Sequence, residues 1–253
     1  MEHIKLTALS QTVITRNHAL ITGDGFVNSV IPGWKNCEIN VVINEAMGAH
    51  FCQLFATLNS DSQIISKTVK SQLFLYVLEG EVSLKINQEI NALSQGSYAY
   101  IPISSEYELK GAKPKTKMLC FIKEYEFAHG IEIPNVIINK EANIEKAIYC
   151  DDPNLIMQNL LPDQNDLRFD MAINIFTYNP GANLPFVETH IMEHGLMYLQ
   201  GQGIYRLDDK WYPVKKGDCI WMAPYCPQWF GALGTEPAVY IYYKNVNRFP
   251  TTI

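Results

Sequence analysis

The chain has 253 residues, of which 47% are hydrophobic and 18% charged, with a formal net charge of −6. This is the composition of a globular protein, and the length accommodates two small domains. No stripe of Lys and Arg and no run of 18 apolar residues is present, which argues against nucleic acid and membranes as partners. The six cysteines form no Cys-x-x-Cys pair and no export signal precedes them, so we expect a cytoplasmic protein with reduced thiols.

Short runs rich in Val, Ile, Tyr and Phe, separated by Gly, Pro, Asn or Asp, predict an all-β protein. In chain order the expected strands are Glu38–Ile43, Phe74–Leu78, Val82–Ile86, Ser97–Ile101, Met118–Ile122, Gly203–Leu207, Cys219–Met222 and Val239–Tyr243. One weak helix is expected at Pro153–Leu161, within a stretch of low strand character at Glu126–Asp166. We interpret this stretch as the connection between two β domains, residues 1–140 and 141–253.

An internal repeat supports this division. The segment Leu75–Gly80 resembles Leu196–Gly201, and the offset between their last residues is 121, since 201 − 80 = 121. The turn glycines Gly96 and Gly217 have the same offset, since 217 − 96 = 121. Two landmarks that share one offset predict two copies of a single β unit.

Four potential metal ligands occur in the second copy: Glu188, His190, His194 and Gln228. On a strand, the first three have equal parity and project to one face, and a closed barrel could bring Gln228 to them. A helix is the alternative, because the two histidines are four residues apart, but Gly195 follows directly and the run onward to the next glycines favours a hairpin. Two unrelated histidines of the core or surface remain the plain alternative. As a metal site, this oxygen and nitrogen set suits Mn²⁺, Fe²⁺, Ni²⁺, Co²⁺ or Zn²⁺.

The pattern resembles the two motifs of the cupin family. The first motif matches at Gly181, Glu188-Thr-His190, His194 and Gly201, and the second at Gly217-Asp218 and Gln228. Generic cupins carry three His and one Glu. Here Glu188 replaces the first His, His194 stands where the Glu is usual, and Gln228 replaces the last His.

With this altered set, the chain resembles the (S)-ureidoglycine aminohydrolases, which are bicupins. The resemblance covers most of the chain, through Arg16–Ile21, Pro32–Trp34, Met47–Phe51, Phe186–Leu196, Gly201–Leu207, Trp211–Val214, Trp221–Pro224 and Gln228–Trp229. It implies two tandem cupin barrels, which are double-stranded β-helix jelly rolls. It also implies one Mn²⁺ per chain on Glu188, His190, His194 and Gln228, and hydrolysis of (S)-2-ureidoglycine to (S)-ureidoglycolate and ammonia in allantoin and purine breakdown.

The same resemblance implies that Glu188, Tyr205, Tyr240 and Lys244 bind the substrate, a small anionic metabolite. Lys244 and Tyr240 are the implied catalytic residues, and they share parity on the last strand, so both can face the barrel interior. Near a cation and in an apolar barrel, the ammonium form of Lys244 would be disfavoured, which suits proton transfer. A solvated Lys at a strand end is the alternative.

Subtracting 121 from the four ligand positions gives Lys67, Val69, Leu73 and Tyr107, a set that cannot hold a divalent cation. We therefore expect a first cupin without metal ligands and a second cupin that binds metal and catalyses. Other functions stay open: a metallo-cupin dioxygenase or isomerase acting on a small chelating acid, or a non-catalytic bicupin that binds a small molecule. Since cupin sheets often associate edge to edge, a homo-oligomer is expected.

Overall fold

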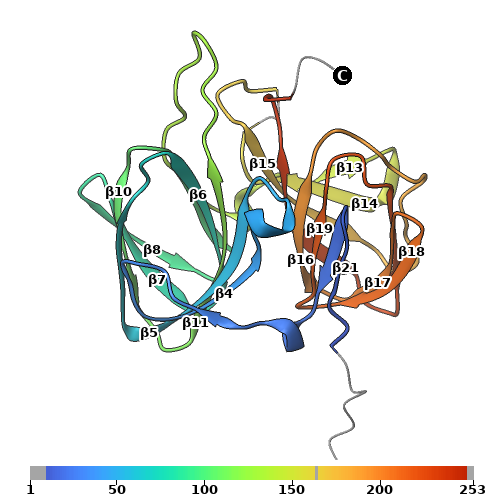
Figure 1. The fold of residues 1–253 in the computed structure, drawn as a ribbon, viewed down its shortest axis with the longest axis horizontal. Coiled ribbons are helices and arrows are strands. Elements are labelled where there is room, and N and C mark those ends of the chain that lie inside the picture. Colours follow the sequence, from blue (N-terminus) through green and yellow to red (C-terminus); the bar gives the residue numbers. More distant parts are fainter. Residues whose placement is uncertain (1–9, 163–164, 250–253) are drawn as a thin grey trace, which may run out of the picture.

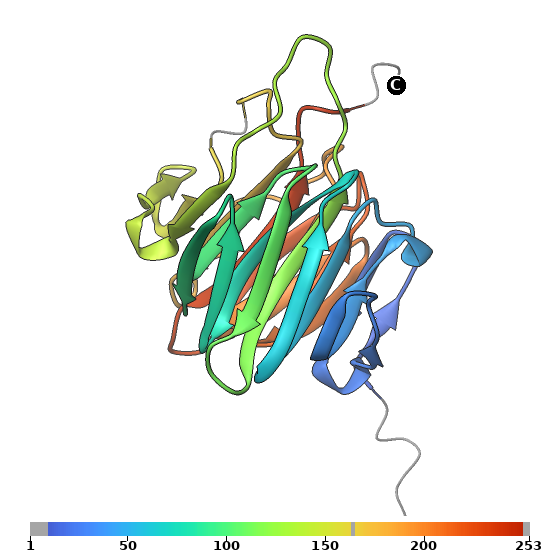
Figure 2. The ribbon, with the colours of Figure 1, turned by 90° about the vertical axis from the view of Figure 1, so that its left-hand side faces the viewer.

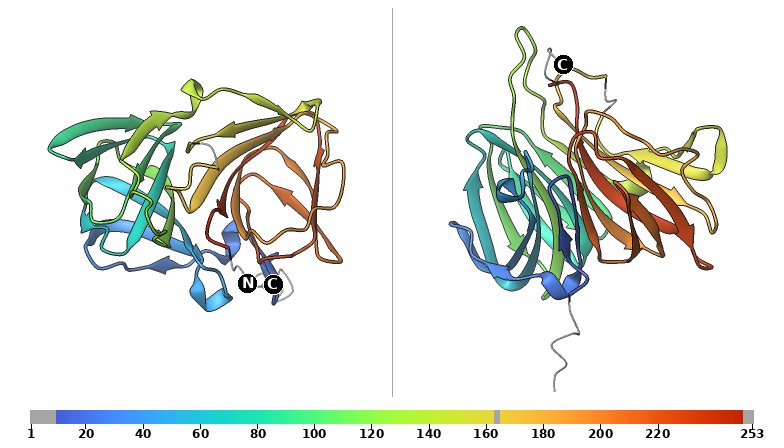
Figure 3. Two further views of the ribbon diagram at one scale, coloured as in Figure 1. Left: turned by 90° about the horizontal axis from the view of Figure 1, so that it is seen from above. Right: turned by 45° about the vertical axis from the view of Figure 1, so that its right-hand side comes forward.

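The computed structural model describes residues 10–162 and 165–249. Two β-barrels lie side by side, the first on the left in Figure 1 and the second on the right, and the left view in Figure 3 shows them from above. Helical structure in the described part is confined to three 3-10 turns, η1 (Gly23–Gly25), η2 (Glu45–Met47) and η3 (Glu141–Asn143). No helix there is long and apolar enough to cross a membrane.

The first barrel is one sheet with the order β12-β9-β6-β11-β5-β10-β7-β8, to which β4 adds through β5 and β3 through β4. Figure 2 views it from its outer side. Its strands are β3 (Asn28–Ser29), β4 (Trp34–Ile43), β5 (Cys52–Lys67), β6 (Ser71–Glu79), β7 (Glu81–Ile86), β8 (Glu89–Ser94), β9 (Ser97–Ile101), β10 (Glu106–Gly111), β11 (Thr116–Glu124) and β12 (Ile137–Lys140).

The second barrel is built from two sheets, one ordered β1-β2-β19-β16-β21-β15-β14-β13 and the other β18-β17-β20. Its strands are β1 (Val13–Ile14), β2 (His18–Ile21), β13 (Ala147–Tyr149), β14 (Asp152–Asn159), β15 (Met171–Tyr178), β16 (His194–Gln200), β17 (Gln202–Leu207), β18 (Lys210–Lys215), β19 (Cys219–Met222), β20 (Gln228–Leu233) and β21 (Ala238–Asn245). The all-β prediction and the two-barrel architecture are confirmed.

The repeat extends to the strand boundaries. Strand β17 begins 121 residues after β7 (202 − 81 = 121), and β18 begins 121 residues after β8 (210 − 89 = 121). The pairing is repeated too, because β6 lies between β9 and β11 as β16 lies between β19 and β21. The predicted duplication therefore extends to these strands and to their pairing.

The two barrels exchange their leading strands. Strand β2, which leads into the first barrel, pairs with β19 of the second barrel, whereas β12, which leads into the second barrel, pairs with β9 of the first. The second sheet therefore draws strands from both halves of the sequence. No spacing in the sequence specifies this exchange, because it depends on pairing between segments about 200 residues apart.

Each barrel has its own apolar interior, and a third apolar cluster joins them. Inside the first barrel pack residues such as Leu54, Leu75 and Leu109, and inside the second Tyr198, Tyr205 and Phe230. The cluster between the barrels combines side chains of both, including Phe51, Phe121, Phe169, Trp221 and Tyr243. Burial of this apolar area holds the barrels against each other.

Three local expectations were wrong. The helix expected at Pro153–Leu161 is strand β14, because that backbone pairs with β13 on one side and β15 on the other, and these ladders outweigh local propensity. The stretch Glu126–Asp166 contains three strands, so it is part of both barrels. The expected hairpin at Gly201 is a corner, since β16 and β17 do not pair but belong to different sheets.

Candidate metal and substrate site

The four ligand candidates meet at one end of the second barrel, although they do not lie on one strand. Residues 186–193 form an irregular segment rather than the expected strand or the alternative helix, and His194 is the first residue of β16. Glu188 and Gln228 form an isolated bridge in which each backbone N–H donates to the carbonyl of the other at 2.8 Å. This bridge fixes both residues opposite each other at the start of β20.

The two imidazoles face each other. The Nε2 atoms of His190 and His194 lie 3.1 Å apart, and the rings are nearly perpendicular. Each Nδ1 lies near a backbone carbonyl, at 3.1 Å from Met192 and 3.3 Å from Tyr243 respectively. Nδ1 is therefore the donor in both rings, which leaves two Nε2 lone pairs directed at one another. Two acceptors at this distance repel each other unless a proton or a metal ion lies between them, and a shared metal ion is one such arrangement of a histidine pair.

Burial keeps the His194 ring neutral. The enclosed position lowers the pKa of His194 well below its usual range, and the nearby positive charges of His190 and Lys244 lower it further. Only the neutral imidazole can give its lone pair to a metal. Both the geometry and the neutral charge state of His194 thus suit a metal ligand.

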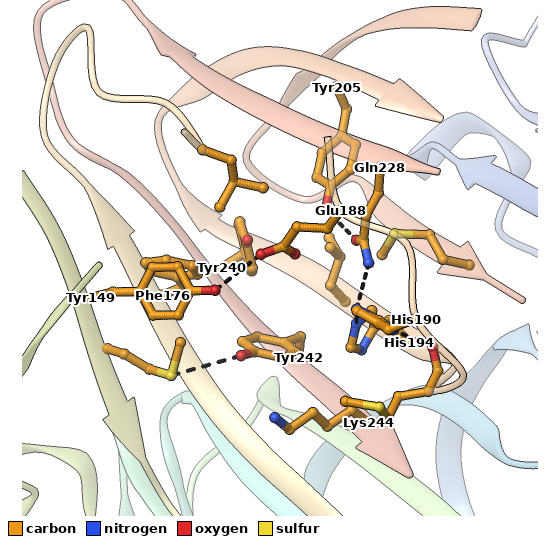
Figure 4. A pocket seen from close by; sticks show the side chains of 15 residues that line it. Tyr149, Phe176, Glu188, His190, His194, Tyr205, Gln228, Tyr240, Tyr242 and Lys244 are labelled. Atoms are coloured by element: carbon orange, nitrogen blue, oxygen red, sulfur yellow. Dashed lines mark hydrogen bonds between the residues drawn. The ribbon is translucent and has the colours of Figure 1, made fainter. Parts of the chain in front are cut away.

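The two ligand candidates that offer oxygen atoms, Glu188 and Gln228, line the same cavity as the histidines. The Gln228 amide Nε2 is 3.0 Å from His190 Nε2, and its Oε1 accepts from the Tyr205 hydroxyl at 3.2 Å. The Glu188 carboxylate is turned toward Tyr149, whose hydroxyl donates to Oε1 at 3.0 Å (Figure 4). Accordingly, within residues 10–162 and 165–249 no three His, Cys, Asp or Glu side chains converge as a ready metal cluster. The donor set nevertheless fits a divalent ion, because two imidazoles, a carboxylate and an amide line one cavity.

This cavity has a volume of about 150 Å³. Besides the four ligand candidates it is lined by Tyr149, Met157, Phe176, Leu184, Met192, Leu196, Tyr205, Met222, Tyr240, Tyr242 and Lys244. Drug-sized ligands occupy pockets of roughly 300–1,000 Å³. The smaller volume accommodates only a small molecule.

Besides Glu188, the three other residues predicted to bind substrate, Tyr205, Tyr240 and Lys244, also line the cavity. Lys244 lies directly opposite His194 on β21, and burial lowers the pKa of its ammonium, an effect that the Glu188 carboxylate partly offsets. The Tyr240 hydroxyl is 2.9 Å from that of Tyr178. Burial raises the pKa of Tyr240 and of Tyr205 well above the usual value, so both phenols stay protonated. Lys244 is consequently the better proton acceptor of the group.

Sequence comparison places these residues in a known family. A Cupin domain model matches residues 174–243, the part that carries all four ligand candidates. The (S)-ureidoglycine aminohydrolase of Arabidopsis thaliana is 35% identical over 248 residues, which is 97% of this chain and 81% of that protein. The (S)-ureidoglycine aminohydrolase of Escherichia coli is 35% identical over 236 residues, 92% of this chain and 89% of that protein. The chain belongs to the (S)-ureidoglycine aminohydrolase family.

Solved structures agree with this membership. The crystal structure of protein Ylba from E. coli superimposes with a TM-score of 0.85 at 31% identity, covering 95% of this chain and 96% of that one. Oxalate decarboxylase from Bacillus subtilis has a TM-score of 0.70 at 11% identity, covering 95% of this chain and 80% of that one. The second likeness establishes only that the two-barrel fold extends beyond the aminohydrolase family.

The first barrel of this family member has a different interior at the corresponding positions. Lys67 lies at the surface in an ion pair with Glu106 at 3.2 Å, and Val69 is exposed. Leu73 and Tyr107 are buried in the apolar core. Two of the four corresponding side chains thus face solvent and two belong to the apolar core, so they form no ligand set.

Two residues at the site were not singled out from the sequence. Tyr149 reaches Glu188 from β13, in the stretch taken as a connection, and no spacing relates it to the ligand segment. Tyr242 lies between Tyr240 and Lys244 on β21 and lines the cavity with them. Its hydroxyl accepts a hydrogen bond from the Asn174 side chain at 3.0 Å. Residues 240, 242 and 244 have the same parity on β21 and therefore project to one face, so the sequence could have identified Tyr242.

Proposed function

We propose that this protein hydrolyses (S)-2-ureidoglycine to (S)-ureidoglycolate and ammonia, as the names of its relatives indicate for them. In the proposed site one Mn²⁺ is held by Glu188, His190, His194 and Gln228. The observation that carries the proposal is the pair of imidazoles whose Nε2 atoms face each other at 3.1 Å, in a cavity that an amide, a carboxylate and Lys244 also line. No thiolate is part of this set, which favours a harder ion such as Mn²⁺.

The charge of the cavity suits an anionic substrate. A divalent ion beside the single carboxylate of Glu188 leaves a net positive charge, which attracts a carboxylate. The four ligand candidates would hold the metal, which would supply electrostatic stabilisation and an anchor for the substrate's oxygens. Ureidoglycine has a carboxylate and a urea carbonyl on either side of the reacting carbon, so two-point anchoring fixes one face of that carbon.

The reaction requires two proton movements. A C–O bond forms from water and the C–N bond to the amine breaks, so the water must lose a proton and the amine must leave as ammonia. We assign the proton acceptor to Lys244, because burial favours its neutral amine. Tyr240 and Tyr205 stay protonated and therefore serve as hydrogen-bond donors that orient the substrate.

Ammonia release from freshly generated ureidoglycine tests the proposal, with chiral analysis of the product and subtraction of the spontaneous decay. The expected result is stereospecific formation of (S)-ureidoglycolate that Glu188→Ala abolishes. Lys67→Ala is the matched control, because Lys67 has the corresponding position in the first barrel. A rate no better than the blank from Mn²⁺-loaded protein would sink the proposed substrate. Loss of activity under strict anoxia would instead favour an oxygenase.

Two further proposals rest on the sequence and not on the site. A cytoplasmic location and assembly into a homo-oligomer stay predictions. Fractionation of cells and sedimentation of the purified protein check them.

A further inference from the structure

One segment of the first barrel lies against the ligand-bearing strand of the second. After η2, Gly48 turns the chain with a φ of 97°, and Ala49 and His50 lead into Phe51 and β5. A Cβ on Gly48 would lie 3.6 Å from the Trp221 ring. The segment Met47–Phe51 belongs to the sequence that resembles the family, but nothing in the proposed chemistry uses it.

The centre of this contact is Glu193, which immediately precedes His194. Its side chain is only 1% exposed. The two carboxylate oxygens accept from the backbone N–H of His50 at 3.1 and 3.3 Å, and Oε2 also accepts from the Trp221 indole at 3.4 Å. The His50 imidazole Nδ1 lies 3.4 Å from Oε1. A buried carboxylate is costly unless such donors surround it, so Glu193 is held in one place.

The backbone of Glu193 connects this contact to the site. Its N–H donates to the Asn245 side chain at 2.7 Å, and the next residue, His194, makes its Nδ1 contact with the Tyr243 carbonyl. Residues 193 and 194 are thus attached to β21 on both sides of Lys244. A displacement of Glu193 would move a ligand candidate and the proposed proton acceptor together.

Phe51 reinforces the same contact. Its ring stacks on Tyr243 with centroids 4.1 Å apart. It also lies so close to β16 that a Cβ on Gly195 would be 2.3 Å from its Cζ atom. Such tight packing has little room to absorb movement, so the position of the first barrel is transmitted to the start of β16.

We propose that the segment Met47–Phe51 of the first barrel positions the metal site of the second, acting through Glu193. This inference rests on the proposed function and gives the barrel that lacks ligand residues a role in catalysis. Glu193 does not line the cavity, so it is a positioning residue rather than a catalytic one. Partners behind a metal ligand typically change metal affinity or activity by about 10- to 100-fold when removed.

The test measures binding of Mn²⁺ alone, from the electron paramagnetic resonance signal of the free ion, together with thermal unfolding and steady-state kinetics at saturating Mn²⁺. The variants are Glu193→Ala and the conservative Glu193→Gln, which keeps an oxygen acceptor for the His50 N–H. The control is Asp170→Asn. Asp170 is another fully buried carboxylate that joins the barrels, through Lys123 at 2.7 Å and Gln72, but it does not line the cavity.

We expect Glu193→Ala to raise the Kd for Mn²⁺ by about 10- to 100-fold and to lower kcat with little change in KM, with partial recovery in Glu193→Gln. Asp170→Asn should lower Tm while the Kd stays within about twofold of the wild type. A wild-type Kd in both Glu193 variants would overturn the inference, as would an equal loss of affinity in Asp170→Asn. If Glu193→Ala does not fold, Glu193→Gln decides by the same criterion.

The outcomes separate this inference from the proposed function. Wild-type protein that binds Mn²⁺ but releases no ammonia contradicts the proposed substrate alone, and the Kd comparison still decides the role of Glu193. Wild-type protein that binds no Mn²⁺ overturns both.

Discussion

Replacing Tyr149 by Phe removes one hydrogen bond from the candidate site and little else. The hydroxyl of Tyr149 donates to Glu188 Oε1 at 3.0 Å, while its ring packs edge-on against Phe176 at 5.0 Å. Burial, and after it the Glu188 charge, raises the pKa of Tyr149, so the hydroxyl remains a donor at neutral pH. Phe keeps the ring contact, and the variant therefore isolates the hydrogen bond.

The expected effect follows from the charge of the acceptor. Hydrogen bonds to charged groups contribute about 1.5–3 kcal/mol of free energy. Tyr149 and Glu188 are both half-buried, so we expect a value at the lower end of this range. Since about 1.4 kcal/mol corresponds to a factor of ten, Tyr149→Phe should raise the Kd for Mn²⁺ or lower kcat/KM by roughly tenfold. Titration of Mn²⁺ and ammonia-release kinetics measure the two quantities separately.

Tyr125→Phe is the matched control. Tyr125 donates to the Arg168 carbonyl at 2.9 Å and does not line the cavity, so its loss should cost only stability, about 1 kcal/mol. The reasoning is refuted if Tyr149→Phe behaves like the wild type in both assays. Equal losses of affinity in the two variants would also contradict it, because they would show a general effect of destabilisation.

Three further predictions concern the proton acceptor, the metal and the buried phenols. Lys244→Ala should abolish ammonia release but retain Mn²⁺; a variant that loses the ion, or keeps its turnover, contradicts the assignment. Mn²⁺ at about 100 times its Kd should stabilise the fold by about 2.7 kcal/mol, raising Tm by roughly 5–10 °C, and EDTA or His190→Ala should remove this shift in a thermal melt. Burial raises the pKa of Tyr107 and of Tyr242 to about 12, so the unfolded chain loses these protons first as the pH passes 10. The free energy of unfolding should then fall by about 1.4 kcal/mol per pH unit for each phenol until the pH reaches its folded-state pKa, and a flat urea-unfolding profile between pH 10 and 12 would contradict this.

The sequence determined the parts of this protein that depend on local pattern. Strand runs with turn glycines predicted an all-β chain, and one offset of 121 residues predicted the duplication. The residue types at 188, 190, 194 and 228 predicted a ligand set because only particular side chains carry lone pairs suited to a metal. These features are local or periodic, so they can be recognised in the sequence without knowledge of the fold.

Tertiary structure decided everything that depends on distant pairing. The helix expected at Pro153–Leu161 became β14 because two neighbouring strands satisfy its backbone, and the irregular segment 186–193 takes its course from the bridge between Glu188 and Gln228. Only the fold brings Tyr149 to the site, since β13 reaches it through its pairing in the sheet. The pairing of β2 with β19 and the contact of His50 with Glu193 join residues more than 100 positions apart, and no local pattern encodes such contacts.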